Sequence, residues 1–110
     1  MTTIKSYTDL NQSRKLAEIL PLESADMIWA NDNDVIVVPY DMATRENVLH
    51  DFIPCWSLAA LLDIYPMVVG RDMDMYCCWQ NHKNLHSKHY NNPVDACFEM
   101  VIKLHELNLL

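Results

Sequence analysis

The chain has 110 residues, a length that fits one domain burying about two-thirds of the surface of its unfolded form. Fifteen Asp and Glu residues against eight Lys and Arg residues give a net charge of -7, which disfavours binding to nucleic acid or to an anionic membrane. Gly70 is the single glycine, so every phosphate-binding loop that needs several glycines is excluded.

The sequence also predicts a compartment. The first residues lack the apolar stretch of a secretory signal. The longest uncharged apolar-rich run, 52–62, is too short to span a bilayer and contains Pro54. We therefore expect a cytoplasmic protein, in which cysteines remain free thiols. The cysteines are Cys55, Cys77, Cys78 and Cys97.

The first half of the chain predicts a helix followed by a β-hairpin. Thr8 is expected to be a hydroxyl N-cap, and Pro21 ends the helix. Two apolar runs, 27–30 and 35–38, are separated by four Asn and Asp residues. This pattern predicts two antiparallel strands, the second of them more buried than the first.

The middle of the chain predicts a loop and a second helix. Residues 40–53 show no clean period, which indicates a loop with one helical turn. The helix is expected to run from about Trp56 or Ser57 to Ile64, with Ser57 as its cap and Trp56 covering the end of the core. Pro66 ends it.

Two further strands are predicted at 67–69 and 75–79, on either side of Gly70 and a polar turn at 71–74. Strand alternation places the side chains of Met75, Cys77 and Trp79 on one face. Gly70 is interpreted as a position from which a side chain is excluded.

The C-terminal segment predicts the best-specified helix. Asn92 is its cap, Pro93 suits the first helical position, and Asn108 suits the left-handed residue after the helix. A narrow polar stripe predicts a helix that is buried over most of its circumference. The stripe comprises Asp95, Glu99, Lys103 and Glu106.

The element order is therefore α-β-β-α-β-β-α within one domain, residues 1–110. Because the connections are too short for several parallel crossovers, we predict an α+β fold. It comprises a small, mostly antiparallel sheet of about four short strands packed with three helices.

Thiols and imidazoles, the ligands that zinc prefers, gather between residues 77 and 89. Adjacent cysteines on a strand point to opposite faces, and no C-x2-C pair is present, so neither a metal nor another cofactor is predicted. The weak candidate ligands are Cys77, Cys78, His82, His86 and His89.

A cysteine nucleophile is the second chemical alternative. Cys55 directly precedes a predicted helix, and a helix N-terminus lowers the pKa of a thiol. Nothing in the sequence places a base beside it, and free cysteine is among the most buried residue types. A core position is therefore favoured, and no catalytic residue is predicted. The candidate bases are His50, His82, His86 and His105.

Aromatic and methionine side chains are interpreted either as core residues or as a patch for protein contact. The candidates for such a patch are Trp29, Trp79, Tyr76, Met73 and Met75.

Three stretches, 24–27, 53–62 and 92–106, together resemble a group of small uncharacterised proteins encoded in genomes and prophage-like elements of gut anaerobes. The Pro-x-Trp-Ser-Leu block within 53–62 carries most of the resemblance. The resemblance implies a phage or mobile-element setting and transfers no catalytic residue.

The leading prediction is a non-enzymatic protein that acts through protein contacts, with a protein partner or a second copy of itself. An accessory role for a phage or mobile element is part of this prediction. The alternative is a small zinc-binding or cysteine-dependent protein that uses Cys55 or the segment from Cys77 to His89.

Overall fold

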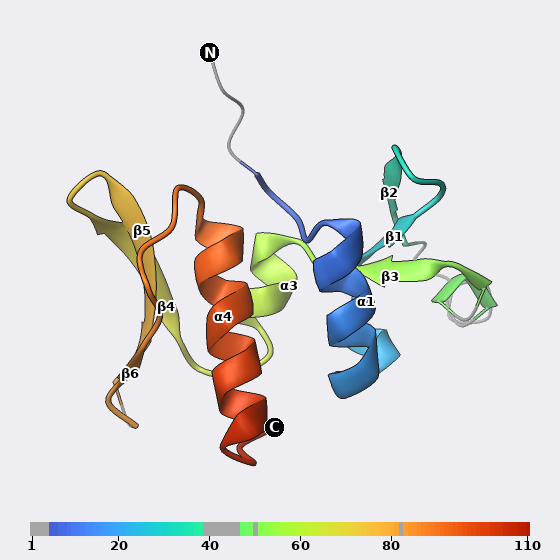
Figure 1. Cartoon of the computed structure of the whole chain (residues 1–110). Coiled ribbons are helices and arrows are strands. Elements are labelled where there is room, and N and C mark those ends of the chain that lie inside the picture. The colour runs from blue at the N-terminus through green and yellow to red at the C-terminus, as the bar shows by residue number, and fades with distance from the viewer. Residues whose placement is uncertain (1–4, 39–46, 50, 82) are drawn as a thin grey trace.

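The computed structural model describes residues 5–38, 47–49, 51–81 and 83–110, and these form an α+β fold, as predicted (Figure 1). The elements in chain order are α1 (Leu10–Ile19), the 3-10 helix η1 (Leu22–Ser24), β1 (Met27–Trp29), β2 (Val35–Val37), β3 (Ile53–Cys55), α3 (Leu58–Leu62), β4 (Val68–Asp72), β5 (Met75–Gln80), β6 (Leu85–His86) and α4 (Pro93–Glu106).

The described strands form two antiparallel sheets of three strands each, instead of the single sheet of about four strands that the sequence predicts. The first sheet has the order β2-β1-β3, and the second has the order β4-β5-β6. In Figure 1, α4 stands between the second sheet and helices α3 and α1, and the first sheet lies on the opposite side of the molecule. The core therefore fills the space around α4, between the two sheets.

Strand β3 is not among the predicted strands, and its first residue, Ile53, lies at the end of the predicted loop. Its central residue is Pro54, which pairs with Ile28 of β1. Proline cannot donate a hydrogen bond to a ladder, so it is confined to edge strands, and β3 lies at an edge of its sheet. Residues 40–46 and 50 of the predicted loop lie outside the described residues, while 47–49 and 51 are helical.

The N-cap of α1 is Asp9, not Thr8. Asp9 Oδ1 accepts a hydrogen bond from Gln12 N at 2.8 Å, and Gln12 Oε1 accepts one from Asp9 N at 3.1 Å, which completes a capping box. Thr8 is fully buried instead. Its Oγ1 contacts Ser13 Oγ at 2.7 Å and accepts a hydrogen bond from Trp56 N at 3.1 Å. The hydroxyl thus joins α1 to the chain before α3.

The first hairpin forms as predicted, with Met27 opposite Val37 and Trp29 opposite Val35. The prediction that its second strand is the more buried one is wrong, because Ile36 is 49% exposed and Val37 is 71% exposed. Among the strands that the structure describes, β2 has a neighbour on one side only, so apolar composition alone does not bury it.

Helix α3 begins and ends inside the predicted range. Ser57 is its N-cap, as predicted, and its Oγ accepts a hydrogen bond from Ala60 N at 3.2 Å. Trp56 is fully buried, and its Nε1 donates to Ser24 Oγ at 2.9 Å. The block that carries the sequence resemblance therefore has a structural role at the start of this helix.

Strand β4 extends three residues further toward the turn than predicted, whereas β5 begins at Met75 as predicted and ends one residue later, at Gln80. Gly70 lies within β4, and a Cβ added there would come within 3.1 Å of the tip of the Trp79 ring, in accordance with the predicted exclusion of a side chain. The turn consists of Met73 and Asp74, whose φ angles are 53° and 66°. Two central residues with positive φ are typical of a type I′ hairpin turn, which fits the twist of the strands.

Helix α4 confirms its predicted cap, first turn and end. Asn92 Oδ1 accepts from Asp95 N at 2.8 Å, Pro93 begins the helix, and Asn108 has a φ of 60°. The predicted polar stripe is less exposed than expected, because Asp95 and Glu99 side chains retain only 26% and 17% exposure. Other segments of the chain cover both carboxylates.

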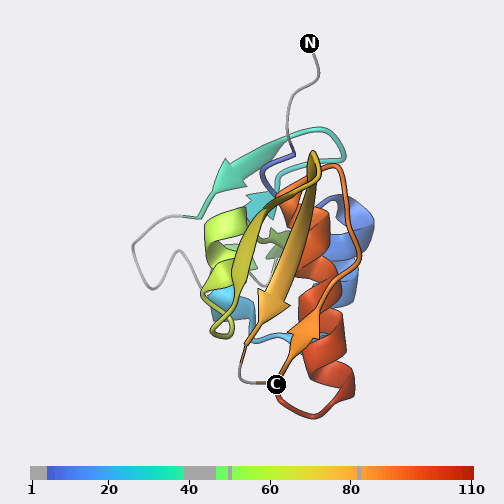
Figure 2. The same cartoon turned by 90° about the vertical axis from the view of Figure 1, so that its left-hand side faces the viewer.

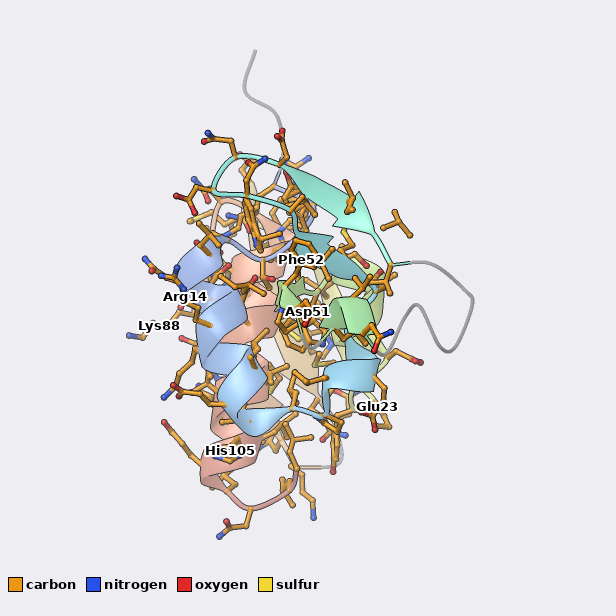
Figure 3. All side chains as sticks on the ribbon, turned by 90° about the vertical axis from the view of Figure 1, so that its right-hand side faces the viewer. Arg14, Glu23, Asp51, Phe52, Lys88 and His105 are labelled. Carbon is orange, nitrogen blue, oxygen red and sulfur yellow. The ribbon has the colours of Figure 1, made fainter. Side chains whose placement is uncertain are left out.

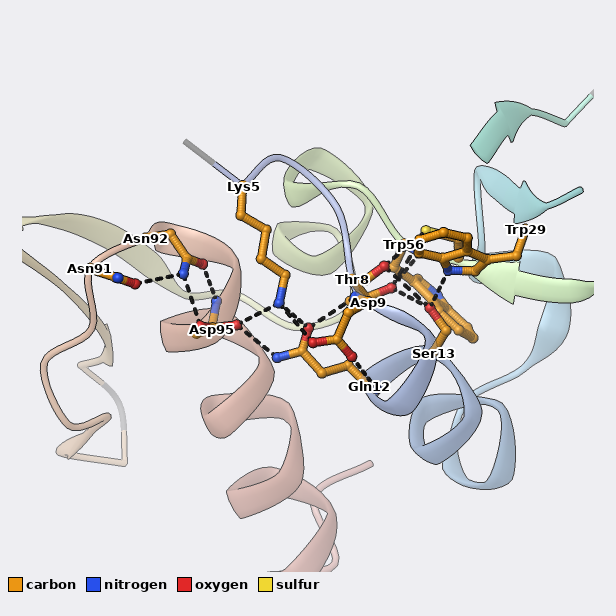
Figure 4. Close-up of polar contacts among 11 residues, drawn as sticks. Lys5, Thr8, Asp9, Gln12, Ser13, Trp29, Trp56, Asn91, Asn92 and Asp95 are labelled. Atoms are coloured by element: carbon orange, nitrogen blue, oxygen red, sulfur yellow. Dashed lines mark hydrogen bonds and ion pairs between the residues drawn. The ribbon is translucent and has the colours of Figure 1, made fainter. Parts of the chain in front are cut away.

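One of these segments contains Lys5 and lies across the first turns of α1 and α4 (Figure 4). Lys5 Nζ donates to Asp95 Oδ1 at 2.8 Å and to Gln12 Oε1 at 2.7 Å, and it pairs with Asp9 Oδ2 at 3.1 Å. Gln12 Nε2 also donates to Asp95 Oδ1, at 2.7 Å. This network joins the N-terminal ends of the two longest helices.

Candidate functional site

The structure separates the Cys and His residues that the sequence places between 77 and 89. Cys77 lies on one face of β5, where its Sγ donates to Ser87 O at 3.3 Å, and His86 Nδ1 lies 3.2 Å from the same oxygen. His89 Nε2 instead pairs with Asp72 Oδ2 at 3.0 Å. His82 lies outside the described residues. In the remainder, no group of three or more His, Cys, Asp or Glu side chains is placed to hold a metal ion.

Cys78 faces the opposite side of β5, toward α4, where it is fully buried beside Cys97. Hydrogen bonding with the Cys97 thiol, together with burial, raises the pKa of Cys78 far above its ordinary value. A thiol in this environment stays protonated and acts as a small apolar core residue.

Cys55 ends β3 and is also fully buried. Burial raises its pKa, and this effect outweighs the hydrogen bonds from Thr8 and Ser13, which favour the thiolate. Its Sγ donates to Thr8 O at 3.3 Å, inside the network of α1. These are the surroundings of a structural thiol, and His105, the candidate base on α4, is exposed.

We expect Cys55 to resist alkylation in the folded protein. Iodoacetamide at about pH 8 is expected to label it orders of magnitude more slowly than in denaturant, because attack needs an accessible thiolate. Peptide mapping by mass spectrometry over time measures the rate. Rapid labelling of the folded protein, with a pH midpoint below about 8.5, would contradict the buried position and restore the nucleophile hypothesis.

The five predicted contact residues do not form one patch. Trp29 belongs to the first sheet, where its ring lies edge-to-face against Tyr7 at 5.9 Å and its Nε1 donates to Ser13 Oγ at 3.2 Å. Tyr76 lies on β5 beneath the Arg71 guanidinium, which is 5.8 Å from the ring centre. Both aromatic rings therefore have intramolecular partners.

The other three candidates gather on the β4–β5 hairpin. Because paired residues share a face, the register places the pairs Val68–Trp79, Gly70–Cys77 and Asp72–Met75 on the side away from α4. We call these six residues the outer face. Figure 2 shows this hairpin in front of α4. Val68 is 51% exposed and Met75 is 39% exposed, while Met73 at the turn is 89% exposed.

Glu99 of α4 holds the chain beside this hairpin, a role that its place in a polar stripe did not indicate. Its Oε2 accepts from Lys88 N at 2.7 Å, and its Oε1 accepts from the Tyr90 hydroxyl at 2.9 Å. Tyr90 in turn exchanges two backbone hydrogen bonds with Tyr76 of β5. The hairpin is thereby fixed to α4 through its inner side, and Val68, Asp72 and Met75 of its outer face stay exposed.

A surface pocket between η1 and α3 is lined by Glu23, Asp26 and Asp63 among other residues. Asp26 is already engaged there, because its carboxylate accepts hydrogen bonds from both the backbone N and the hydroxyl of Ser57. This pair fixes the start of α3. The acidic lining therefore has a structural role at Asp26, because this carboxylate holds the N-cap of α3.

None of the helices within the described ranges combines the length and the apolar character that crossing a bilayer requires. Comparison of the chain with protein-family models, with curated proteins and with solved structures finds no match.

Proposed function

We propose that this chain is a non-enzymatic binding protein that holds a protein partner against the outer face of its second sheet. The observation that carries the proposal is the exposure of Val68, Met75 and Met73 on one hairpin. Exposed apolar side chains that gather on one surface are typical of protein contact sites.

The conformation of Met73 supports this proposal. A type I′ turn favours Asn, Asp or Gly, because a side chain larger than these is strained at positive φ. Met73 nevertheless occupies the position with a φ of 53° and has no burial to offset the strain. The turn is therefore less stable with Met73 than it would be with Asn at this position. In return, Met73 places an exposed, flexible thioether at the tip of the hairpin.

The charge around this sheet indicates the chemistry of the partner. Residues 67–92 contain three Lys and Arg against two Asp, whereas the rest of the chain contains five Lys and Arg against thirteen Asp and Glu. The second sheet is thus the part of the molecule that least repels carboxylates. A partner with an apolar centre and little net charge at its rim fits this nearly neutral segment best.

The phage or mobile-element setting rests on the sequence resemblance alone and stays a prediction. It suggests that the partner is a protein of the host cell or of the element itself.

Replacing Met73 by Asn is expected to change stability and binding in opposite directions. The free energy of unfolding should rise by about 0.5–1 kcal/mol, because Asn tolerates the left-handed conformation. Retention of a partner from a lysate of the source cells on the immobilised chain should fall at least about tenfold, because the exposed apolar tip is lost. Urea denaturation and quantitative mass spectrometry measure the two effects.

The second variant is Met75→Asp, which places a carboxylate at the turn end of the outer face, and Leu110→Asp is its matched control on an exposed apolar residue elsewhere. The control is expected to retain the same proteins as the unmodified chain, while Met75→Asp loses them. Equal retention by all variants, or retention of no protein at stoichiometric amount, would refute the outer face as a binding site.

A further inference from the structure

We infer that the free edge of β2 pairs with the same edge of a second copy of this chain, so that the first sheets of two copies form one continuous sheet. This inference concerns the opposite side of the molecule from the outer face. It is therefore independent of the proposed function, and each can fail without the other.

The hydrogen bonds at the two ends of the β1–β2 pair show which backbone groups face inward. Ala30 N donates to Asp34 O at 2.8 Å, and Val38 N donates to Asp26 O at 3.0 Å. In an antiparallel pair, residues that bond to the neighbouring strand alternate with residues that do not. Residue 36 therefore also bonds to β1, as 34 and 38 do.

It follows that Val35 and Val37 direct their N–H and C=O groups away from β1. No strand among the described residues pairs with β2 on that side, since the sheet order is β2-β1-β3. Unpaired backbone groups in a row are a template for another strand. Strands β1 and β3 offer no comparable template of apolar, β-branched residues, because β1 is central and β3 contains Pro54.

The side chains of β2 fit a contact between proteins better than they fit solvent. Ile36 is 49% exposed, Val37 is 71% exposed, and both are β-branched apolar residues. No Lys or other charged residue lies within the strand, although charge is the usual protection of an exposed edge. Figure 3 shows β2 at the margin of the first sheet, with β1 on its inner side.

A second copy of β2 can bond to the outward N–H and C=O groups of this strand, because two identical strands can pair in antiparallel orientation. With a two-fold axis at Ile36, Val35 lies opposite Val37 of the second copy, and Val37 lies opposite its Val35. Each of these pairs can exchange both N–H···O bonds, so every outward group of the strand finds a partner. The two Ile36 residues then form the pair with the shorter spacing, about 4.5 Å between Cα atoms.

The net charge of -7 does not prevent this pairing. The nearest carboxylate in the chain is Asp34, two residues from the axis. At about 3.4 Å per residue, the two Asp34 residues would lie about 14 Å apart along the strands. This separation exceeds the screening length of about 8 Å at physiological ionic strength, so their repulsion is largely screened.

The short strand sets the strength of the dimer. Pairing over three residues buries much less than the roughly 1,600 Å² of a stable interface, so we expect a weak dimer with a dissociation constant on the order of 0.1–1 mM. Dimers should therefore form at high protein concentration and dissociate on dilution.

Concentration-dependent amide hydrogen exchange of the full chain, followed by NMR, tests the geometry directly. Between about 20 µM and about 1 mM, the N–H groups of Val35 and Val37 are expected to gain protection at least severalfold. The N–H of Ile36 is expected to be protected at every concentration, because it bonds to β1. Sedimentation equilibrium over the same series should show an average mass that rises above 12.8 kDa.

Val37→Pro removes an outward donor and no bond to β1, so it is expected to keep the chain monomeric. Val37→Thr is the matched control, because it retains the N–H and a β-branched shape and should dimerise within about twofold of the unmodified chain. If the proline variant does not fold, Ile36→Lys replaces it, since two ammonium groups at the axis should weaken the dimer at least tenfold. Leu110→Lys controls for the added charge.

A mass that stays at 12.8 kDa up to 1 mM would overturn the inference. So would a dimer that forms equally well in Val37→Pro or Ile36→Lys, because the contact would then lie elsewhere. If protection at Val35 and Val37 appears only when another protein is added, the edge pairs with a different chain, and the inference of self-pairing is wrong.

Discussion

Replacing Trp56 by Ala is expected to lower the free energy of unfolding by about 3–5 kcal/mol, a large part of the stability of a domain of this size. Trp56 is fully buried between η1 and α3, and the change leaves a cavity among residues of the core cluster. It also removes the indole donor to Ser24 Oγ. The midpoint of urea denaturation at unchanged slope measures the loss.

The matched control is Trp56→Phe, which keeps an aromatic ring in the core and removes the Nε1 hydrogen bond. Its expected cost is about 1–2 kcal/mol, clearly less than that of the alanine variant. An alanine variant within about 1 kcal/mol of the unmodified protein would show that Trp56 does not fill the core.

Asp95→Ala is expected to cost about 2 kcal/mol near neutral pH, because it removes an acceptor of charge-assisted hydrogen bonds. Asp95 accepts from Lys5 Nζ and Gln12 Nε2 at Oδ1, and from Asn92 Nδ2 at Oδ2. Its side chain is only 26% exposed, so water compensates poorly for the lost contacts. Urea denaturation again gives the measurement.

The cost of Asp95→Ala should depend on pH. Burial by itself would raise the pKa of Asp95, but the hydrogen bonds from Lys5, Asn92 and Gln12 outweigh it and lower the pKa. A carboxyl group of this kind stabilises the fold above its unfolded pKa of about 3.9, and the contribution is lost as pH falls through the folded pKa. The destabilisation is therefore expected to be full at about pH 6 and reduced at about pH 2.

Glu106→Ala is the control for this pH effect, because Glu106 is an exposed carboxylate at the end of the same helix. It is expected to change stability by less than about 0.5 kcal/mol at both pH values. If Asp95→Ala costs the same at pH 2 as at pH 6, the carboxylate charge does not hold the network, and the prediction is refuted.

The sequence predicted correctly the helix ends and the hairpin whose formation depends on hydrogen bonds between residues close together in the chain. The ends of α4 follow from Asn92, Pro93 and Asn108, each of which acts within one turn of itself. The β1–β2 hairpin follows from its turn residues for the same reason: Asn31 Oδ1 accepts hydrogen bonds from both Asn33 N and Asp34 N.

Features that depend on distant neighbours were predicted poorly. Apolar composition suggested that β2 is buried, yet burial is set by how many strands lie beside it. The lack of a clean period over 40–53 indicated a loop, yet residues 53–55 pair with β1 as an edge strand, which tolerates Pro54. A turn within 71–74 was predicted, but Met73 and Asp74 lack the usual Asn-Gly signature, so its two-residue type I′ form was not predicted.

In the candidate sites, too, features set by neighbouring residues were predicted and features set by distant residues were not. The alternation of side chains on β5 predicted correctly that Cys77 and Cys78 face opposite sides. The pairing of His89 with Asp72 joins residues 17 positions apart, and no spacing rule indicates it. The grouping of Met73 and Met75 away from Trp29 required knowledge that the strands form two sheets instead of one.

The hydrogen bond from Lys5 to Asp95 spans 90 positions of the chain, and this separation has a consequence for folding during synthesis. At about 5–20 residues per second, a ribosome takes on the order of 5–20 s to add the residues between the two. Until α4 has been made, α1 lacks the acceptor that fixes its first turn to the rest of the molecule, and the inner side of the second sheet lacks the helix that covers it. The nascent chain thus exposes core surface during most of its synthesis, and the last helix completes the fold.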